Sequence, residues 1–238
     1  MSLYRLDGFL SEYSSFSRRE AVRLIRNGLV KLGTAAVRDP SVRFDPAERS
    51  VTVSGRLIPY RTDNTLMMNK SEGVISATDD PREKTALSLI RPEDLYPLPA
   101  PAGRLDKDVT GLLLLTSDGQ YCHKIISPSG QIFKTYEALV DGCPDGNDIR
   151  LFAEGLTLSD GESFLPAYLS ILQAGRASLC ELKICEGRYH QVKRMLAAVG
   201  KPVIKLRRTA IGGLKLDESL APGEYRRLSG EEKALVFE

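Results

Sequence analysis

The chain has 238 residues, of which 42% are hydrophobic and 27% are charged, and its formal net charge is +2. This composition is typical of a soluble globular protein with one large domain, or a small domain joined to a larger one. No stretch approaches the roughly 18 apolar residues of a membrane span. The N-terminal sequence MSLYRLDGFL lacks the basic and apolar regions of a signal peptide, so we predict a cytoplasmic protein without membrane segments.

Composition also argues against a metal centre or a disulfide framework. The chain contains two histidines, and its four cysteines show no C-x-x-C spacing. We therefore predict no bound metal.

Charge is unevenly distributed along the chain. Residues 1–60 hold ten Lys and Arg against six Asp and Glu, a balance of +4. A basic front segment fits a polyanionic partner, although a solvated charged surface would give the same balance.

The first sixty residues predict two helices followed by short strands. Ser17 and Glu20 have the spacing of a capping box for a helix that begins at Arg18, and Asn27-Gly28 can end it. The segments LVKLG and SVTVSGRLI alternate in polarity as short strands do.

One face of the helix that begins at Arg18 carries a stripe of Arg19, Arg23 and Arg26, opposite an apolar face. The stripe alone would also fit an ordinary solvated face. However, the segment RLDGFLSEYSSFSRREAVRLIRNGLVKLG resembles the S4 RNA-binding domain. The matching positions are Arg5, Leu6, Asp7, Leu10, Ser17, Arg18, Ala21, Ile25, Gly28, Val30 and Gly33. This resemblance implies that Arg5, Arg18, Arg19, Arg23 and Arg26 contact RNA.

Further along, the polarity pattern predicts a mixture of strands and helices. We expect strands in TLMMNK, GLLLLT, KTYEALV and ASLCELKIC, and an irregular proline-rich segment at residues 91–102. We expect helices in QYCHKII, HQVKRMLAAVG and near SGEEKALVF. The order lacks strict β-α-β alternation, which favours a mixed or antiparallel sheet with helices packed against it.

The stretch AGRLDKDVTGLLLLT places charged residues directly before a segment that is apolar enough to be buried. Asp106 lies between Arg104 and Lys107, where a nearby cation favours the ionised carboxylate and burial opposes it. A simple turn into a core strand would explain the same pattern. From these residues alone, Asp106 could have either a catalytic role or only a structural role in the turn.

Three separate segments resemble the signature elements of pseudouridine synthases. They are GRLDKDVTGLLLLTSDG, FKTYEALV and EGRYHQVKRMLAAVG. The resemblance implies that Asp106 is the catalytic aspartate, that Tyr136 lies against the target base, and that Lys193 pairs with Asp106. His190 in the third segment is similar to the ribosomal small-subunit (RsuA) type.

The resemblance implies a complete architecture and reaction. We expect an α+β protein with an S4 (alpha-L) domain at residues 1–58, a linker at 59–65, and a catalytic domain at 66–238. The catalytic domain would hold a mixed, mainly antiparallel central sheet flanked by helices. The reaction detaches uracil, turns it and rejoins it through carbon, without a metal or cofactor. Asp106 would act as a nucleophile or remove a ribose proton, and the sequence leaves both open.

Further basic and polar residues are candidates for RNA contacts. Arg104 can fill the gap left by a flipped uridine, or pair with Asp108 within the turn. His190 can contact a phosphate or cap the following helix. We expect Lys134, Gln191 and Arg194 to line the substrate groove, while Arg207 and Arg208 add a basic pair that an ordinary surface could also show.

Other classes of function remain as alternatives. A glycoside hydrolase could use Asp106 and Asp108 as paired carboxylates, but the chain lacks the tryptophan that usually forms sugar platforms. A synthase acting on large-subunit RNA, or a non-catalytic RNA-binding assembly factor, would also contain an S4 domain. Since Asp106, Tyr136 and Lys193 are all present, we predict catalysis. The expected partner is ribosomal RNA of the small subunit. No heptad or apolar patch in the sequence argues for a dimer, so we expect a monomer.

Overall fold

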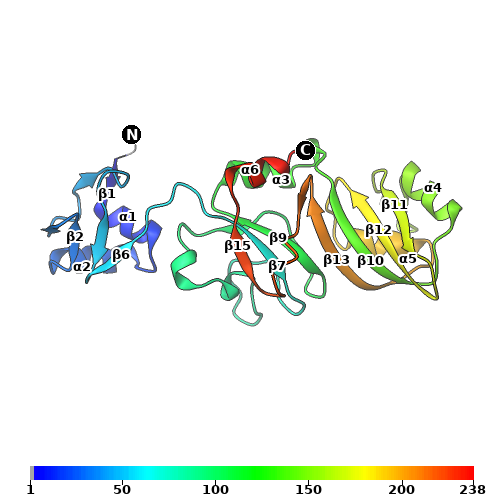
Figure 1. Ribbon diagram of the computed structural model, residues 1–238, viewed down its shortest axis with the longest axis horizontal. Coiled ribbons are helices and arrows are strands. Elements are labelled where there is room, and N and C mark those ends of the chain that lie inside the picture. The colour runs from blue at the N-terminus through cyan, green and yellow to red at the C-terminus, as the bar shows by residue number, and fades with distance from the viewer. Residues whose placement is uncertain (1–2) are drawn as a thin grey trace. The chain divides into compact units, whose positions relative to one another are not determined.

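The structure is a computed structural model that describes residues 3–238. These residues divide into two compact units. The first comprises the described residues up to Asn64 together with Ile90–Pro99, and the second comprises Thr65–Leu89 and Ala100–Glu238. Figure 1 shows the elements of both units.

The first unit packs two helices against a small antiparallel sheet. The helices are α1 (Leu6–Tyr13) and α2 (Arg18–Arg26). The sheet has the order β3-β2-β5-β6, formed by Ala35–Val37, Val30–Leu32, Val51–Val53 and Arg56–Ile58. A separate strand pair joins β1 (Tyr4–Arg5) to β4 (Arg43–Phe44), and a 3-10 turn covers Pro92–Asp94.

The predicted start of α2 is confirmed in detail. The Ser17 hydroxyl accepts a hydrogen bond from the Glu20 backbone N–H at 3.3 Å, and the Glu20 carboxylate accepts from the Ser17 backbone N–H at 2.8 Å. Ala21 and Ile25 are fully buried against α1 and the sheet, whereas the arginines of the helix are exposed. The sequence pattern therefore separates a packing face from a basic face, as expected.

The second unit is built on one nine-stranded sheet. Its main order is β11-β12-β10-β13-β9-β7-β15, with β14 beside β13 and β8 beside β9. All pairings are antiparallel except that of β13 with β9, so the prediction of a mixed, mainly antiparallel sheet is confirmed. In chain order, β7–β15 cover Thr65–Lys70, Ala100–Pro101, Thr110–Thr116, Lys134–Asp141, Tyr168–Gln173, Ala177–Ile184, Val203–Ile211, Leu214–Lys215 and Tyr225–Arg227.

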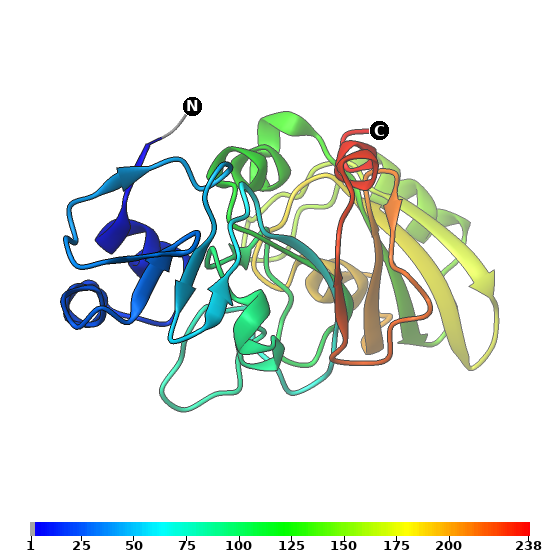
Figure 2. The same ribbon diagram turned by 60° about the vertical axis from the view of Figure 1, so that its left-hand side comes forward.

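Four helices flank this sheet. They are α3 (Gly119–Ile126), α4 (Gly146–Glu154), α5 (Gln191–Ala198) and α6 (Gly230–Leu235), and 3-10 turns cover Leu87–Leu89 and Pro128–Gly130. Figures 1 and 2 show α3 and α6 beside each other, and the Tyr121 hydroxyl of α3 donates to the Lys233 carbonyl of α6 at 3.1 Å. In the described part of the chain, every helix is too short or too polar to cross a membrane.

Strand β9 is the centre of this unit because both of its faces are buried. Leu112 and Leu114 pack with α3 and α6, whereas Leu113 and Leu115 alternate to the other face, and all four side chains are fully buried. The expected strand GLLLLT is therefore confirmed as a core strand. The turn that carries Asp106 leads directly into this strand, so its C-terminal end is fixed by the core.

Gly111 fixes the parallel contact between β9 and β13. Its φ is +99°, and an added Cβ would lie 2.2 Å from the Arg208 carbonyl oxygen and 2.9 Å from Arg207 Cγ. We expect Gly111→Ala to lower the free energy of unfolding by about 3–5 kcal/mol, through backbone strain and steric overlap. Gly119→Ala is the matched control, since no atom lies within 4 Å of its added Cβ. Urea unfolding measures both variants, and equal midpoints would contradict this account of β9.

Candidate active site

The turn that carries Asp106 is held by neighbouring backbone. Leu105 is buried, its N–H donates to Ser76 Oγ at 2.9 Å, and the Ser76 hydroxyl donates to the Leu105 carbonyl at 2.9 Å. The Val109 N–H donates to the Asp106 carbonyl at 3.1 Å, which closes the turn. The side chain of Asp106 is 33% exposed, so this carboxylate is fixed in place and still reachable by a ligand.

A buried lysine, Lys70, also stabilises this turn by a hydrogen bond to its backbone. Lys70 is fully buried at the end of β7, and its ammonium donates to the carbonyls of Ser71 at 3.0 Å and Lys107 at 3.3 Å. Burial lowers the pKa of Lys70 to about 8, while the charges of Asp108 and Asp106 oppose that decrease. The turn is therefore bonded through the Lys107 carbonyl to a buried lysine whose charge its own carboxylates favour.

Two basic side chains of one segment approach Asp106. His190 Nε2 lies 3.6 Å from Asp106 Oδ1, and Lys193 Nζ lies 3.5 Å from Asp106 Oδ2. Lys193 is closer to Asp108, with Nζ 2.6 Å and 2.8 Å from its two carboxylate oxygens. The hydrogen bond from Lys193 lowers the pKa of Asp108. Lys193 therefore bridges two carboxylates, whereas the sequence predicted a pair with Asp106 alone.

His190 stands at the start of α5 in a left-handed backbone conformation, with φ +49° and ψ +30°. Its side chain makes no capping hydrogen bond to the helix, so the predicted capping alternative is not observed. The imidazole faces Asp106 instead. Because a non-glycine residue rarely adopts this conformation, the local structure holds His190 there at a cost in free energy.

Tyr136 lies on β10 opposite Arg208 of β13. The guanidinium lies over the tyrosine ring at 6.0 Å from its centroid, and Arg208 Nη1 donates to the Tyr136 hydroxyl at 3.5 Å. Arg208 Nε also donates to the Leu112 carbonyl at 2.8 Å. The Nη2 atom is buried without a hydrogen-bond partner among the described residues. Arg208 therefore contacts both the ring and the hydroxyl of Tyr136 across the β10–β13 pair.

These groups meet in one cleft, which we call the Asp106 cleft. It is lined by Arg104, Leu105, Asp106, Val109, Tyr136, Ile184, Gly187, Arg188, His190, Gln191, Val192, Lys193 and Leu206. Four separate parts of the sequence, residues 104–109, Tyr136, residues 184–193 and Leu206, thus share one surface. A carboxylate flanked by cations and faced by an aromatic ring can act on a planar ligand as a nucleophile or a base.

The predicted groove residues separate into two groups. Arg104 and Gln191 line the cleft; Arg104 is exposed and forms no ion pair with a described residue, so the predicted pair with Asp108 is not observed. Gln191 is buried, and its amide donates to Glu186 at 2.7 Å and accepts from the Arg188 backbone N–H at 3.1 Å. Both ends of the Gln191 amide are therefore bonded within the protein, and the residue stabilises the wall of the cleft.

Lys134 and Arg194 lie outside the lining of the cleft, contrary to expectation. Lys134 is buried at the start of β10, and burial lowers its pKa. Arg194 forms ion pairs with Glu162 at 2.6 Å and Asp160 at 2.9 Å, and it lies over the Phe164 ring. Burial of the first cation and pairing of the second explain why neither reaches the cleft.

The other predicted RNA-binding residues belong to the first unit. Arg5 and Arg18 both approach the buried Asp7, at 3.0 Å and 3.6 Å, and the hydrogen bond from Arg5 lowers the pKa of Asp7. Arg19, Arg23 and Arg26 are exposed and form no ion pair with a residue that the structure describes. The stripe of three arginines is therefore available to an anionic ligand.

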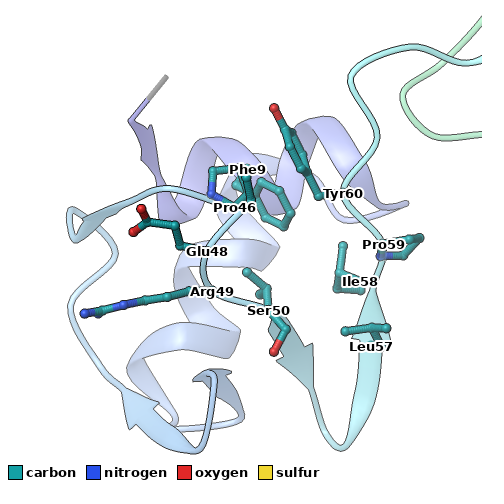
Figure 3. Close-up of a pocket in the computed structure, with 11 residues that line it drawn as sticks. Phe9, Pro46, Glu48, Arg49, Ser50, Leu57, Ile58, Pro59 and Tyr60 are labelled. Atoms are coloured by element: carbon teal, nitrogen blue, oxygen red, sulfur yellow. The ribbon is translucent and has the colours of Figure 1, made fainter. Parts of the chain in front are cut away.

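The first unit also contains a hollow of its own. Figure 3 shows Phe9 and Tyr60 beside Ile58, with Pro46 and Ser50 also in its lining. None of the predicted site residues lines it. Among residues 3–238, no cluster of three or more His, Cys, Asp or Glu side chains could hold a metal.

Arg208 contacts Tyr136, but the sequence did not identify it as a residue of the site. It was predicted only as half of a basic surface pair, yet it is 3% exposed. A usable signal existed in VIKLRRTAI, because Leu206 and Ala210 flank Arg208 at strand spacing and predict a buried face. Arg207, on the opposite face, is less buried and pairs with Glu218 at 3.1 Å.

Comparison with known proteins defines the class of enzyme that this cleft belongs to. Residues 64–198 match the family model described as RNA pseudouridylate synthase. The chain therefore belongs to the RNA pseudouridylate synthase family. The family match covers the turn of Asp106, the strand of Tyr136 and the helix of Lys193.

Individual relatives cover almost the whole chain. An "Uncharacterized RNA pseudouridine synthase YtzG" of Bacillus subtilis (strain 168) is 41% identical over 98% of each chain. "Ribosomal small subunit pseudouridine synthase A" of Escherichia coli (strain K12) is 40% identical over 98% of this chain and 99% of its own length. A solved structure titled "Crystal structure of pseudouridylate synthase" matches with a TM-score of 0.68 and 38% identity, covering 98% of this chain and 99% of that one.

Proposed function

We propose that this pseudouridine synthase modifies ribosomal RNA of the small subunit, with Asp106, Tyr136 and Lys193 as its catalytic residues. The observation that carries the assignment of residues is their meeting in the Asp106 cleft from three distant segments. The choice of RNA is supported by the relatives named ribosomal small subunit pseudouridine synthase A, including those of Escherichia coli and Yersinia pestis.

In the proposed reaction, the bond between uracil N1 and ribose C1′ breaks and the base leaves with the electron pair. Asp106 drives this step either by bonding to C1′ or by removing a ribose proton. The base then turns and C5 bonds to C1′. As this bond forms, the bond from Asp106 to C1′ breaks or, in the other route, Asp106 returns the proton to the ribose, and the hydrogen of C5 leaves as a proton. Tyr136 offers its ring to the base and its hydroxyl to that proton. Lys193, 3.5 Å from Asp106, stabilises the charge of the carboxylate.

A uridine inside a helix cannot reach Asp106, so the substrate nucleotide must turn out of its stack. This step costs about a few kcal/mol and is easiest for an unpaired base. Arg104 is exposed at the cleft and its guanidinium is free of ion pairs with described residues. We infer that it stacks in the place that the uridine leaves.

The substrate proposal is tested by release of tritium from transcripts labelled at C5 of uridine, because rejoining at C5 expels that hydrogen. We expect release from small-subunit transcripts or particles and none from large-subunit RNA. Release from large-subunit RNA alone would show that the substrate is large-subunit RNA instead. Binding without release from either RNA would favour the non-catalytic assembly factor.

We propose further that the first unit is an S4-type RNA-binding domain whose contacts run through the arginines of α2. The combined change of Arg19, Arg23 and Arg26 to Ala should weaken RNA binding. It should also reduce the magnitude of the slope of log K against log salt by about 2–3, since each of the three lost phosphate contacts removes about 0.7–0.9.

A matched control removes three exposed cations of the second unit, Arg176, Lys183 and Lys205, which do not line the Asp106 cleft. Fluorescence anisotropy across a salt series measures both sets. An unchanged slope in the α2 variant, or an equal loss in the control, would contradict a specific role for the stripe.

The state of the cysteines supports action in the cytoplasm. All four cysteines are free thiols. Free thiols are typical of proteins in reducing compartments.

A further inference from the structure

Among residues 3–238, Tyr189 is the most exposed large hydrophobic or aromatic residue, at 76%. Exposed apolar side chains are common on protein surfaces, so exposure alone says little. The position of Tyr189 is what sets it apart. Its chain neighbours Arg188 and His190 both line the Asp106 cleft, so the ring stands at the margin of that cleft.

The ring is also ordered by its neighbour. The centroids of the Tyr189 and His190 rings lie 3.8 Å apart with an angle of 17° between the planes, which is a stacked geometry. His190 in turn lies 3.6 Å from Asp106. A two-ring stack therefore extends outward from the carboxylate of the cleft, and the outer ring is exposed to solvent.

The backbone of this turn is fixed before any ligand binds. The Gln191 N–H donates to the Arg188 carbonyl at 3.2 Å, and the buried Gln191 side chain is anchored on Glu186 at 2.7 Å. His190 keeps its left-handed conformation within this frame. A turn held in a costly conformation at a cleft edge indicates that the direction of its side chains matters for function.

Two exposed arginines lie at the cleft that the stack borders. The Arg188 side chain is 51% exposed although it pairs with Glu162 and Glu186, and Arg104 is exposed at the same cleft. Exposed aromatic rings beside cations are the usual means of holding unpaired nucleotides, because bases stack on the rings and phosphates contact the cations. The surroundings thus fit a nucleotide better than an apolar peptide.

We propose that the Tyr189–His190 stack is a binding platform for a nucleobase next to the flipped uridine. The inference rests on the proposed site at Asp106. A uridine that turns into the cleft leaves each of its two neighbours with one unstacked face. Arg104 covers one of these faces, and the outer face of Tyr189 covers the other. The platform selects RNA whose nucleotide beside the target is unpaired, such as a loop or a bulge.

A fluorescent base tests the platform directly. The probe is a short single-stranded RNA with one uridine and a 2-aminopurine on its 5′ or 3′ side. We expect the wild-type protein and Tyr189→Phe to quench one of the two probes. Tyr189→Ala should lose that quenching and bind about 10-fold more weakly, as expected for one base stacked on an aromatic ring. Tyr168→Ala is the matched control, since Tyr168 is 62% exposed and does not line the cleft.

Tritium release from C5-labelled small-subunit transcripts separates this inference from the proposed function. Tyr189→Ala should raise KM more than it lowers kcat, while Tyr189→Phe stays near wild type. Quenching and KM unchanged in Tyr189→Ala would overturn the platform while wild-type release leaves the isomerase intact. Equal losses in Tyr189→Phe and Tyr189→Ala would also overturn it, because the hydroxyl rather than the ring would then make the contact.

Discussion

Asp106→Asn should abolish tritium release from C5-labelled RNA, with kcat lowered by at least about 10⁴-fold, as is typical when a catalytic nucleophile or base is removed. The amide keeps the shape of the side chain but loses its charge, so it can neither bond to C1′ nor accept a ribose proton. RNA affinity should change little, because the exposed arginines of the first unit and the walls of the Asp106 cleft remain.

Circular dichroism and RNA binding serve as the controls for this variant. Folded, RNA-binding Asp106→Asn protein without tritium release would assign the chemistry to this carboxylate. Tritium release near the wild-type rate would remove Asp106 from the reaction and turn attention to Asp108. The stability of the fold should be almost unchanged, since the Asp106 side chain is one third exposed and the nearest basic atoms, on His190 and Lys193, lie 3.6 Å and 3.5 Å from it.

Elements with local signals were predictable from the sequence. The capping box at Ser17, the helix in QYCHKII and the apolar run of β9 are each indicated by nearby residues in the sequence, and all three are confirmed. Helix α4 was missed although Asp145 and Asp148 form a capping box before it. The second carboxylate is Asp rather than the more familiar Glu, and Gly146 weakens the helical pattern.

Non-local pairing explains what the sequence could not supply. β13 was missed because three cations interrupt its apolar alternation, and its parallel partner β9 lies far earlier in the chain, with Thr110 paired to Arg207. That pairing places Arg208 opposite Gly111, and the pairing of β13 with β10 places it opposite Tyr136. No local pattern encodes such a register, so the resemblance could name Tyr136 but not the residue that holds it.

Lys193→Met should lower kcat by about 10²–10³-fold, the usual effect of removing one electrostatic partner in an active site. The ammonium is the only lysine group within 4.0 Å of Asp106 among the described residues. Lys193→Arg keeps the charge and should restore most of the activity. KM should change less than kcat, because the cleft retains its aromatic and arginine side chains.

Asp108→Asn is the decisive companion to this variant, because Lys193 lies closer to Asp108 than to Asp106. Distance alone would therefore favour Asp108 as the functional partner. Exposure argues the opposite: the Asp108 side chain is 64% exposed against 33% for Asp106, and His190 contacts only Asp106 of the two. We expect Asp108→Asn to retain activity within a few-fold, since the released ammonium can then bond to Asp106 alone. A loss as large as that of Asp106→Asn would instead show that both carboxylates take part in the chemistry.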